Sequence, residues 1–184
     1  MDNLKLWNSV CKTDPKHTKP AKIGGMSITA IAPQYQVMNA TKEFGPYGVK
    51  WGFKDIDLDY SLIEKYDIIV FKGTFFCPEG ESKIINSAKM HMDRAKKMVD
   101  ADFAKKIETD SLTKALSKLG FNADVFMGRF DDVKYVADMN IEFAEPLPLT
   151  DTDNGWINAI KAGTSQLEQI DDLTYREFIK GNLK

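Results

Sequence analysis

Residues 100–132 constrain the fold of this chain more than any other segment. Their apolar side chains recur at the three- and four-residue spacing of a helix that buries one stripe. These side chains are Phe103, Ala104, Ile107, Leu112, Ala115, Leu116 and Leu119. Asp100 or Asp102 can cap the start, and Gly120 stands where a left-handed residue would end the helix. The sequence therefore predicts an amphipathic helix of about five turns.

The remaining face of this predicted helix combines positive charge with small hydroxyl groups. Its side chains are Lys105, Lys106, Thr109, Asp110, Thr113, Lys114, Ser117 and Lys118. Lysines and hydroxyls both contact phosphate oxygens in nucleic-acid complexes. We therefore expect a face that can hold phosphates.

Three strand-like segments precede the helix, over residues 48–58, 66–77 and 82–90. The first alternates apolar and polar residues, and turn-forming residues 78–81 separate the second from the third. We expect a curved antiparallel sheet with the long helix across one face. This β-β-β-α core with flanking helices belongs to the α+β class.

Shorter segments flank this core. Residues 4–11 read as a short amphipathic helix, and residues 16–22 as a basic loop that leads into two glycines. A helix should begin at Pro33 and end at Gly45, with its inner face formed by Val37, Ala40, Thr41 and Phe44. After the long helix, the residues expected to pack against the core are Val125, Phe126 and Met127, with Arg129 pointing outward.

Composition indicates an ordinary globular protein. A hydrophobic fraction of 43% over 184 residues is enough to bury a core without disulfides or metals. The longest apolar runs have strand length, so we expect no membrane span and no membrane partner. Cys11 and Cys77 lie far apart and lack the spacing of a zinc site, and no signal peptide is evident. We therefore expect a cytoplasmic protein.

Charge is unevenly distributed along the chain. Residues 1–25 carry five lysines against two acids, and residues 83–118 carry nine basic side chains against five acidic ones. Residues 131–184 carry five basic side chains against eleven acidic ones. The Pro-containing segment 145–149 reads as an extended linker. We expect a core domain over residues 1–144, followed over residues 145–184 by the linker and an acidic helical tail.

Two blocks of the sequence, in this order, carry a family resemblance. The first consists of Pro33-Gln34-Tyr35, Ala40-Thr41-Lys42-Glu43-Phe44-Gly45-Pro46-Tyr47-Gly48 and Trp51-Gly52. The second consists of Ala104-Lys105-Lys106, Thr109-Asp110, Leu112-Thr113-Lys114-Ala115-Leu116, Leu119-Gly120-Phe121 and Ala123-Asp124-Val125. Together they resemble the phage single-strand annealing proteins of the Rad-fifty-two superfamily, which act as recombinases.

This resemblance implies the same β-β-β-α core and a function in phage homologous recombination and repair. The protein would bind single-stranded DNA by its backbone and let complementary strands pair, passing through an annealed duplex intermediate. Such annealing needs no ATP, no cofactor, no metal and no catalytic residue, so the chain would not be an enzyme. Because one domain touches few nucleotides, we expect a homo-oligomeric ring or helical filament. The protein would act in the cytoplasm of a bacterial host, if the chain is phage-encoded.

Basic side chains supply the sequence-independent attraction to DNA, and aromatic rings can stack on bases. The expected DNA-binding residues are Lys16, Lys19, Tyr35, Lys50, Arg94, Lys96, Lys97, Lys105, Lys106, Lys114, Lys118 and Arg129. Tyr47 and Trp51 are further candidates for stacking, although all three aromatic residues also suit a core.

Two other functions remain open. Asp67 at a strand start, with Glu81 and Lys83 across a turn, can imitate the acid and Glu-x-Lys arrangement of an Mg²⁺-dependent nuclease. A phage protein-interaction or inhibitor module would instead use the acidic tail. In an annealing protein the same tail is available to bind a partner protein. No phosphate loop of the Gly-x-x-x-x-Gly-Lys-[Ser/Thr] type occurs, which disfavours a strand-exchange ATPase.

Overall fold

A three-stranded sheet packed against one long helix forms the centre of the first of two units in the computed structural model. The structure describes residues 2–23, 25–92, 95, 98–144 and 149–183. The units are Met1–Phe143 and Ala144–Lys184, and each is described by itself.

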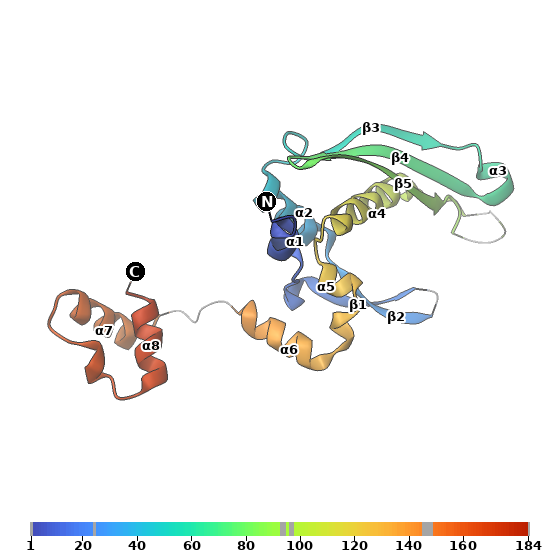
Figure 1. Ribbon diagram of the computed structural model, residues 1–184. Helices are drawn as coiled ribbons and strands as arrows, with labels where there is room; N and C mark the ends of the chain where they lie inside the picture. The colour runs from blue at the N-terminus through green and yellow to red at the C-terminus, as the bar shows by residue number, and fades with distance from the viewer. Residues whose placement is uncertain (1, 24, 93–94, 96–97, 145–148, 184) are drawn as a thin grey trace. The chain divides into compact units, whose positions relative to one another are not determined.

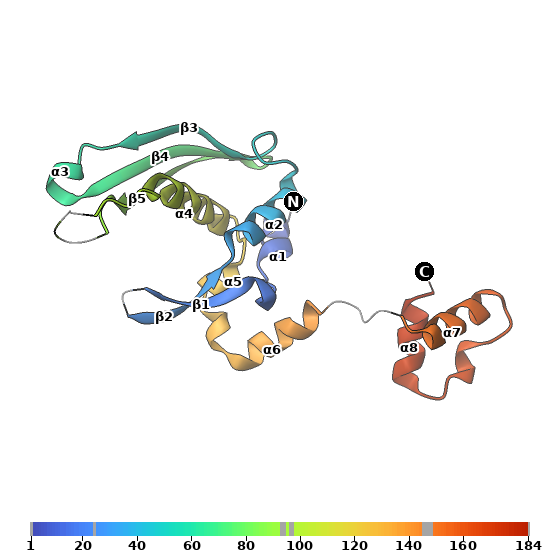
Figure 2. The same cartoon turned by 180° about the vertical axis from the view of Figure 1, so that it is seen from behind.

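The sheet contains β3 (Gly52–Asp59), β4 (Ile68–Cys77) and β5 (Gly80–Lys89), antiparallel in the order β3-β4-β5. Helix α4 (Phe103–Lys118) covers one face of this curved sheet (Figure 1, Figure 2). The predicted α+β class and β-β-β-α core are therefore confirmed. The short helix α3 (Ile63–Tyr66) connects β3 to β4.

Alternation along β4 gives the sheet its two faces. Ile69, Phe71 and Phe75 are almost fully buried on the side of α4, where Asn86 Nδ2 of β5 donates a hydrogen bond to Ser111 Oγ of the helix at 3.3 Å. The other face carries ion pairs. Lys72 Nζ lies 2.7 Å from Asp59 Oδ2, and Lys54 Nζ lies 2.5 Å from Glu81 Oε1. The sheet thus buries one face and exposes the other.

Helices α1 (Lys5–Val10) and α2 (Pro33–Phe44) complete the main core. Its buried residues are Val10, Ala40, Phe44, Trp51, Phe75, Ile84, Ala115, Leu116 and Phe121. Aromatic rings meet edge to face there, with centroids 5.5 Å apart for Phe44 and Phe121. The inward residues predicted for α2 are correct except Thr41, which is exposed.

The amino-terminal basic segment is a β-hairpin, so the predicted loop over residues 16–22 is wrong for most of its length. After the 3-10 turn η1 (Pro15–His17), β1 (Thr18–Ile23) pairs with β2 (Met26–Ile31). Ile23 pairs with Met26, and Gly25 has a φ of +88°. The Gly-Gly pair that follows the basic segment is a two-residue hairpin signal, and this signal predicts the observed turn.

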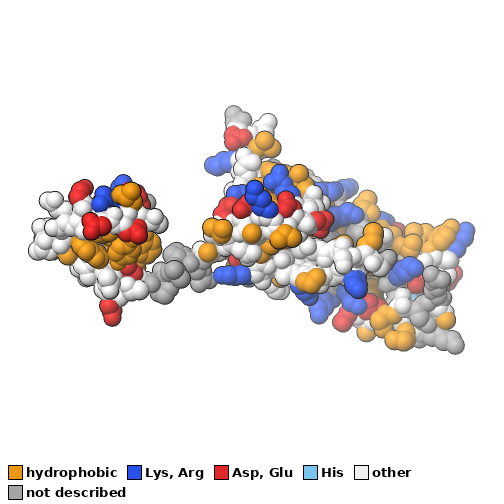
Figure 3. Space-filling model, turned by 90° about the horizontal axis from the view of Figure 1, so that it is seen from below, with side chains coloured by type: hydrophobic (Ala, Val, Ile, Leu, Met, Phe, Trp, Pro, Cys, Tyr) orange, Lys and Arg blue, Asp and Glu red, His pale blue; other side chains and the backbone are white. Residues whose placement is uncertain are grey.

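The segment after α4 differs from the prediction. It forms α5 (Ala123–Phe126), the 3-10 turn η2 (Arg129–Asp131) and α6 (Val133–Glu142), of which α6 was not predicted. Phe126 and Met127 are 53% and 64% exposed, so their expected core packing is wrong. The four-residue helix α5 instead turns Ala123 and Asp124 inward. Seen from below, the surface shows hydrophobic side chains between charged ones (Figure 3).

The second unit contains α7 (Asp151–Lys161), the 3-10 turn η3 (Leu167–Gln169) and α8 (Leu173–Gly181). Its small core is formed by Ile157, Ile170 and Ile179. Asp172 caps α8, and Thr150 caps α7 in a capping box with Asp153. The predicted linker falls mainly on residues 145–148, outside the described residues. Within the described ranges, no helix is long and apolar enough to cross a membrane.

Candidate nucleic-acid interface

The lysines of α4 lie on two sides of the helix, which corrects the single polar face expected from the sequence. Successive helical residues are rotated by about 100°, so Lys105 and Lys106 cannot share a stripe. Lys105 lines a cavity between α4 and α2 together with Thr109 and Thr113. The sequence prediction grouped these residues into one face because all of them are polar. In the structure, α2 packs against the side of α4 that carries Lys105, Thr109 and Thr113.

The first side of α4 is a stripe of charged residues at four-residue intervals, which we call the lysine stripe. It consists of Lys106, Asp110, Lys114 and Lys118, all exposed. Lys106 Nζ lies 2.7 Å from Asp100 Oδ2. This hydrogen bond lowers the pKa of Asp100 and raises the pKa of Lys106. Among the described residues no carboxylate forms an ion pair with Lys114 or Lys118, so the stripe carries net positive charge.

Lys105 is exposed on the second side of α4, at the rim of a cavity of about 210 Å³. Gln36 of α2 lies in the wall, only 2% exposed, and its Oε1 accepts a hydrogen bond from Thr113 Oγ1 at 2.8 Å. Gln36 was missed in the sequence, although it shares a helical stripe with Ala40 and Phe44. A glutamine on an apolar stripe was the available signal.

The amino-terminal candidates occupy η1 and the hairpin. Lys16 and Lys19 are both exposed. Tyr35 is only 7% exposed, and its ring stacks on His17 with centroids 4.3 Å apart. Its hydroxyl accepts a hydrogen bond from the N–H of Asp14 at 3.1 Å. The ring of Tyr35 therefore supports the start of the hairpin and offers a base almost no free surface.

The other aromatic candidates differ in exposure. Trp51 is fully buried and donates from Nε1 to the carbonyl oxygen of Gly45 at 2.9 Å. Tyr47 is 45% exposed and meets Trp51 edge to face, with centroids 4.9 Å apart. Burial, together with the nearby Glu108, raises the pKa of Tyr47. Of the three rings considered for stacking, Tyr47 has the most accessible surface.

The remaining basic candidates are scattered. Lys50 is exposed in the turn before β3. Arg129 is exposed, with its guanidinium 5.6 Å from the ring centroid of Tyr135. The candidates Arg94, Lys96 and Lys97 lie outside the described residues.

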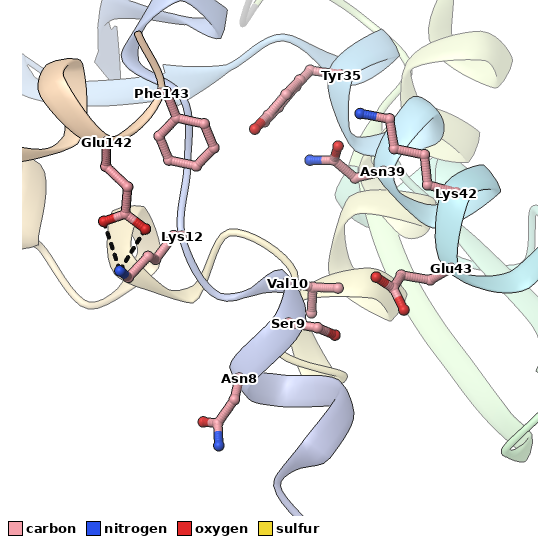
Figure 4. A pocket seen from close by; sticks show the side chains of 10 residues that line it. All are labelled: Asn8, Ser9, Val10, Lys12, Tyr35, Asn39, Lys42, Glu43, Glu142 and Phe143. Carbon is pink, nitrogen blue, oxygen red and sulfur yellow. Dashed lines mark hydrogen bonds and ion pairs between the residues drawn. The ribbon is translucent and has the colours of Figure 1, made fainter. Parts of the chain in front are cut away.

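A second cavity, of about 390 Å³, lies between α1, α2 and α6 (Figure 4). The Lys12 ammonium forms an ion pair with the Glu142 carboxylate at 2.6 Å on one side of it. Lys42 and Glu43 line the other side. Two lysines face two carboxylates here, so this cavity has no net attraction for a polyanion.

The arrangement expected for a nuclease is not assembled. Asp67 precedes β4, whereas Glu81 pairs with Phe76 near the far end of the same hairpin. Nine residues of strand separate these positions, or about 30 Å. Asp67 Oδ1 instead lies 2.5 Å from His91 Nδ1, and Glu81 pairs with Lys54. In the described part of the chain no group of three or more His, Cys, Asp or Glu side chains could hold a metal ion.

Comparison of the sequence with protein-family models and with curated proteins found no match. The fold and the candidate interface define an α+β protein in which a sheet-backed helix presents lysines on two sides.

Proposed function

We propose that this protein binds single-stranded DNA and anneals complementary strands without ATP. The observation that carries the proposal is the lysine stripe, because Lys114 and Lys118 have no ion-pair partner among the described residues and stand on a helix that packs against the sheet. The two sequence blocks that resemble phage single-strand annealing proteins support the same function.

The chemistry of annealing suits such a surface. Two complementary strands repel one another through their phosphates, and lysines that neutralise those phosphates lower the repulsion regardless of sequence. Binding through the backbone leaves the base edges free to find their complements. Pairing itself is energetically downhill, so the protein needs neither a nucleotide cofactor nor covalent chemistry.

We further propose that the protein works as a homo-oligomer, as a ring or a helical filament. β3 and β5 are the two edge strands of the sheet and can pair with strands of another subunit. A head-to-tail contact closes into a ring or continues as a filament, according to its rotation. Light scattering and electron microscopy with and without single-stranded DNA test this point. A strict monomer that anneals at full rate would contradict it.

An annealing assay with complementary oligonucleotides, without nucleotide and in EDTA, tests the proposed function. We expect the protein to accelerate pairing well above the spontaneous rate, and to leave non-complementary oligonucleotides unpaired. In this proposal annealing does not require the acidic tail. The tail would instead bind a partner protein.

The same assay discriminates the nuclease alternative. With Mg²⁺ in place of EDTA, the proposal requires that the oligonucleotides stay intact. Strand cleavage that Glu81→Ala abolishes would replace annealing by nuclease activity as the function. A strict requirement for ATP would also refute the proposal.

A further inference from the structure

Gln36, in the wall of the cavity between α2 and α4, has a buried amide donor with no acceptor among the described residues. The side chain of Gln36 is 2% exposed, and Thr113 occupies its Oε1. Its Nε2 has no hydrogen-bond partner among the described residues. Buried amide groups in native proteins are nearly always paired, so an acceptor from outside the chain fits this position.

The surroundings of Gln36 favour a negatively charged acceptor. Lys105 lines the same cavity and forms no ion pair among the described residues. The first turn of α2, a helix of 12 residues, forms another part of the wall, and Ala32 at its N-cap supplies no side-chain hydrogen bond. The positive end of the helix dipole therefore lies in the cavity wall, and the first turn of α2 carries no acidic side chain to offset it. Glu108 is the one carboxylate that we find in the lining, and it opposes this attraction.

The donors left over in the cavity suit an oxyanion better than a nucleobase. The hydroxyl of Thr109 donates to the carbonyl oxygen of Lys105 at 2.8 Å, and that of Thr113 donates to Gln36. The amide of Gln36 and the ammonium of Lys105 remain, and both only donate. The lining described for this cavity includes no aromatic ring on which a base could stack.

We propose that this cavity binds a phosphate group, held by Gln36 Nε2, Lys105 Nζ and the amino-terminal turn of α2. In the DNA-bound protein the group is a phosphodiester of the single strand, an assignment that rests on the proposed function. The volume of 210 Å³ accommodates a phosphate with several waters, each of which occupies about 30 Å³ in the liquid.

Inorganic phosphate tests the site without DNA. NMR of the full chain follows the side-chain amide of Gln36 as phosphate replaces chloride at constant ionic strength. We expect saturable shifts of this amide, weakened about tenfold in Lys105→Ala. Glu108→Gln should tighten binding, because it removes the opposing charge. Lys134→Ala, an exposed lysine outside the site, serves as the matched control and should leave binding unchanged.

A second variant tests the amide donor, and the melting curve of the first separates binding from folding. Gln36→Glu keeps the acceptor for Thr113 but replaces the two N–H donors by an anionic oxygen, so it should abolish phosphate binding. Lys105→Ala changes an exposed side chain and should keep the wild-type melting curve. An unshifted Gln36 amide, or equal phosphate affinity in wild type and Lys105→Ala, would overturn the site.

Oligonucleotides identify the source of the phosphate. If the phosphate is a backbone phosphodiester, Lys105→Ala should lower the salt slope of single-strand binding by about 0.7, with no change in Lys134→Ala. An unchanged slope together with normal phosphate binding would overturn the phosphodiester assignment and leave a site for free phosphate. A wild-type chain that binds phosphate at Gln36 but no single-stranded DNA would refute the proposed function while confirming the site.

Discussion

The carboxylate of Asp124 accepts two hydrogen bonds from Thr13, 111 residues away in the sequence. The backbone N–H of Thr13 donates at 2.8 Å and its hydroxyl at 2.6 Å. The Tyr135 hydroxyl also donates to Asp124, at 3.0 Å, and Asn122 Nδ2 donates to the Thr13 hydroxyl at 2.9 Å. Asp124 and Thr13 are both buried, so this network joins the amino-terminal segment to α5 and α6.

Asp124→Asn tests the network. The substitution keeps the shape of the side chain but turns an amide toward donors that need an acceptor. We expect the free energy of unfolding to fall by about 2 kcal/mol, the cost of leaving a buried donor unsatisfied. Urea unfolding measures it. Asp138→Asn, which changes an exposed carboxylate of α6, should be nearly neutral, and equal effects of the two changes would contradict the structural role.

Through Tyr135, the network around Asp124 should also make the free energy of unfolding depend on pH above pH 10. Burial, together with its hydrogen bond to Asp124, raises the pKa of Tyr135 to about 12. The unfolded chain releases this phenolic proton near pH 10, before the folded chain does. Stability from this group is therefore complete below pH 10 and is lost as the pH rises from about 10 to about 12.

The measurement is the free energy of unfolding of wild type and Tyr135→Phe over this pH range. We expect the advantage of wild type to shrink between pH 10 and 12 and to be constant below pH 10. Ultraviolet titration of the folded proteins should show one tyrosine fewer ionising at the highest pH in the variant. An ordinary pKa of about 10 for Tyr135 would contradict the assignment.

The sheet and α4 could be predicted because their patterns are periodic. Strands β4 and β5 alternate in burial, and Ile107, Ala115 and Leu116 are buried on α4 as the spacing indicated. The network around Asp124 could not be predicted in this way. A buried polar side chain has no period, and its partners depend on how distant segments meet.

The candidate interface shows the same limit. Exposure of Lys105, Lys106 and Lys114 followed from their charge and is borne out. The helical rotation of about 100° per residue separates Lys105 from Lys106, but the cavity beside Lys105 depends on where α2 packs, which no local pattern encodes. Gln36 is a candidate because its amide nitrogen has no partner among the described residues and its side chain lines a cavity, and both facts depend on tertiary packing.

Gly120 ends α4 in a conformation that an ordinary residue tolerates poorly. Its φ is +97°, and a Cβ there would lie 2.7 Å from Cδ2 and Cε3 of Trp7. We expect Gly120→Ala to lower the free energy of unfolding by about 3 kcal/mol, through backbone strain and a clash with a rigid ring. Gly128→Ala separates the two causes, since Gly128 has a φ of +75° but only an ordinary contact for a Cβ.

For Gly128→Ala we expect a loss of about 1 kcal/mol, from the backbone alone. Thermal and urea unfolding of both variants give the comparison. Equal losses would show that Trp7 yields to the new methyl group without cost, and that its packing over Gly120 contributes little to the fold.

Asp100 should restrain the affinity of the protein for DNA. Its carboxylate holds the ammonium of Lys106 at 2.7 Å and places a negative charge beside the lysine stripe. Under the proposed function, Asp100→Asn should strengthen single-strand binding and steepen the salt dependence, because Lys106 becomes free to meet a phosphate. Fluorescence anisotropy over a range of salt concentrations measures both. Weaker binding in the variant would mean that Asp100 instead positions Lys106 for its contact.

The lysine stripe itself gives the most direct prediction. Lys106→Ala combined with Lys114→Ala should weaken single-strand binding equally for all sequences, because both side chains would contact phosphates and no bases. The slope of log affinity against log salt should fall by about 0.7 for each lost contact. Lys65→Ala combined with Lys134→Ala removes the same charge from exposed positions elsewhere in the first unit and should leave the slope unchanged. Because both pairs alter net charge equally, a similar fall in each would mean that α4 contributes only general attraction, and an unchanged slope in the first pair would show that these lysines are merely solvated.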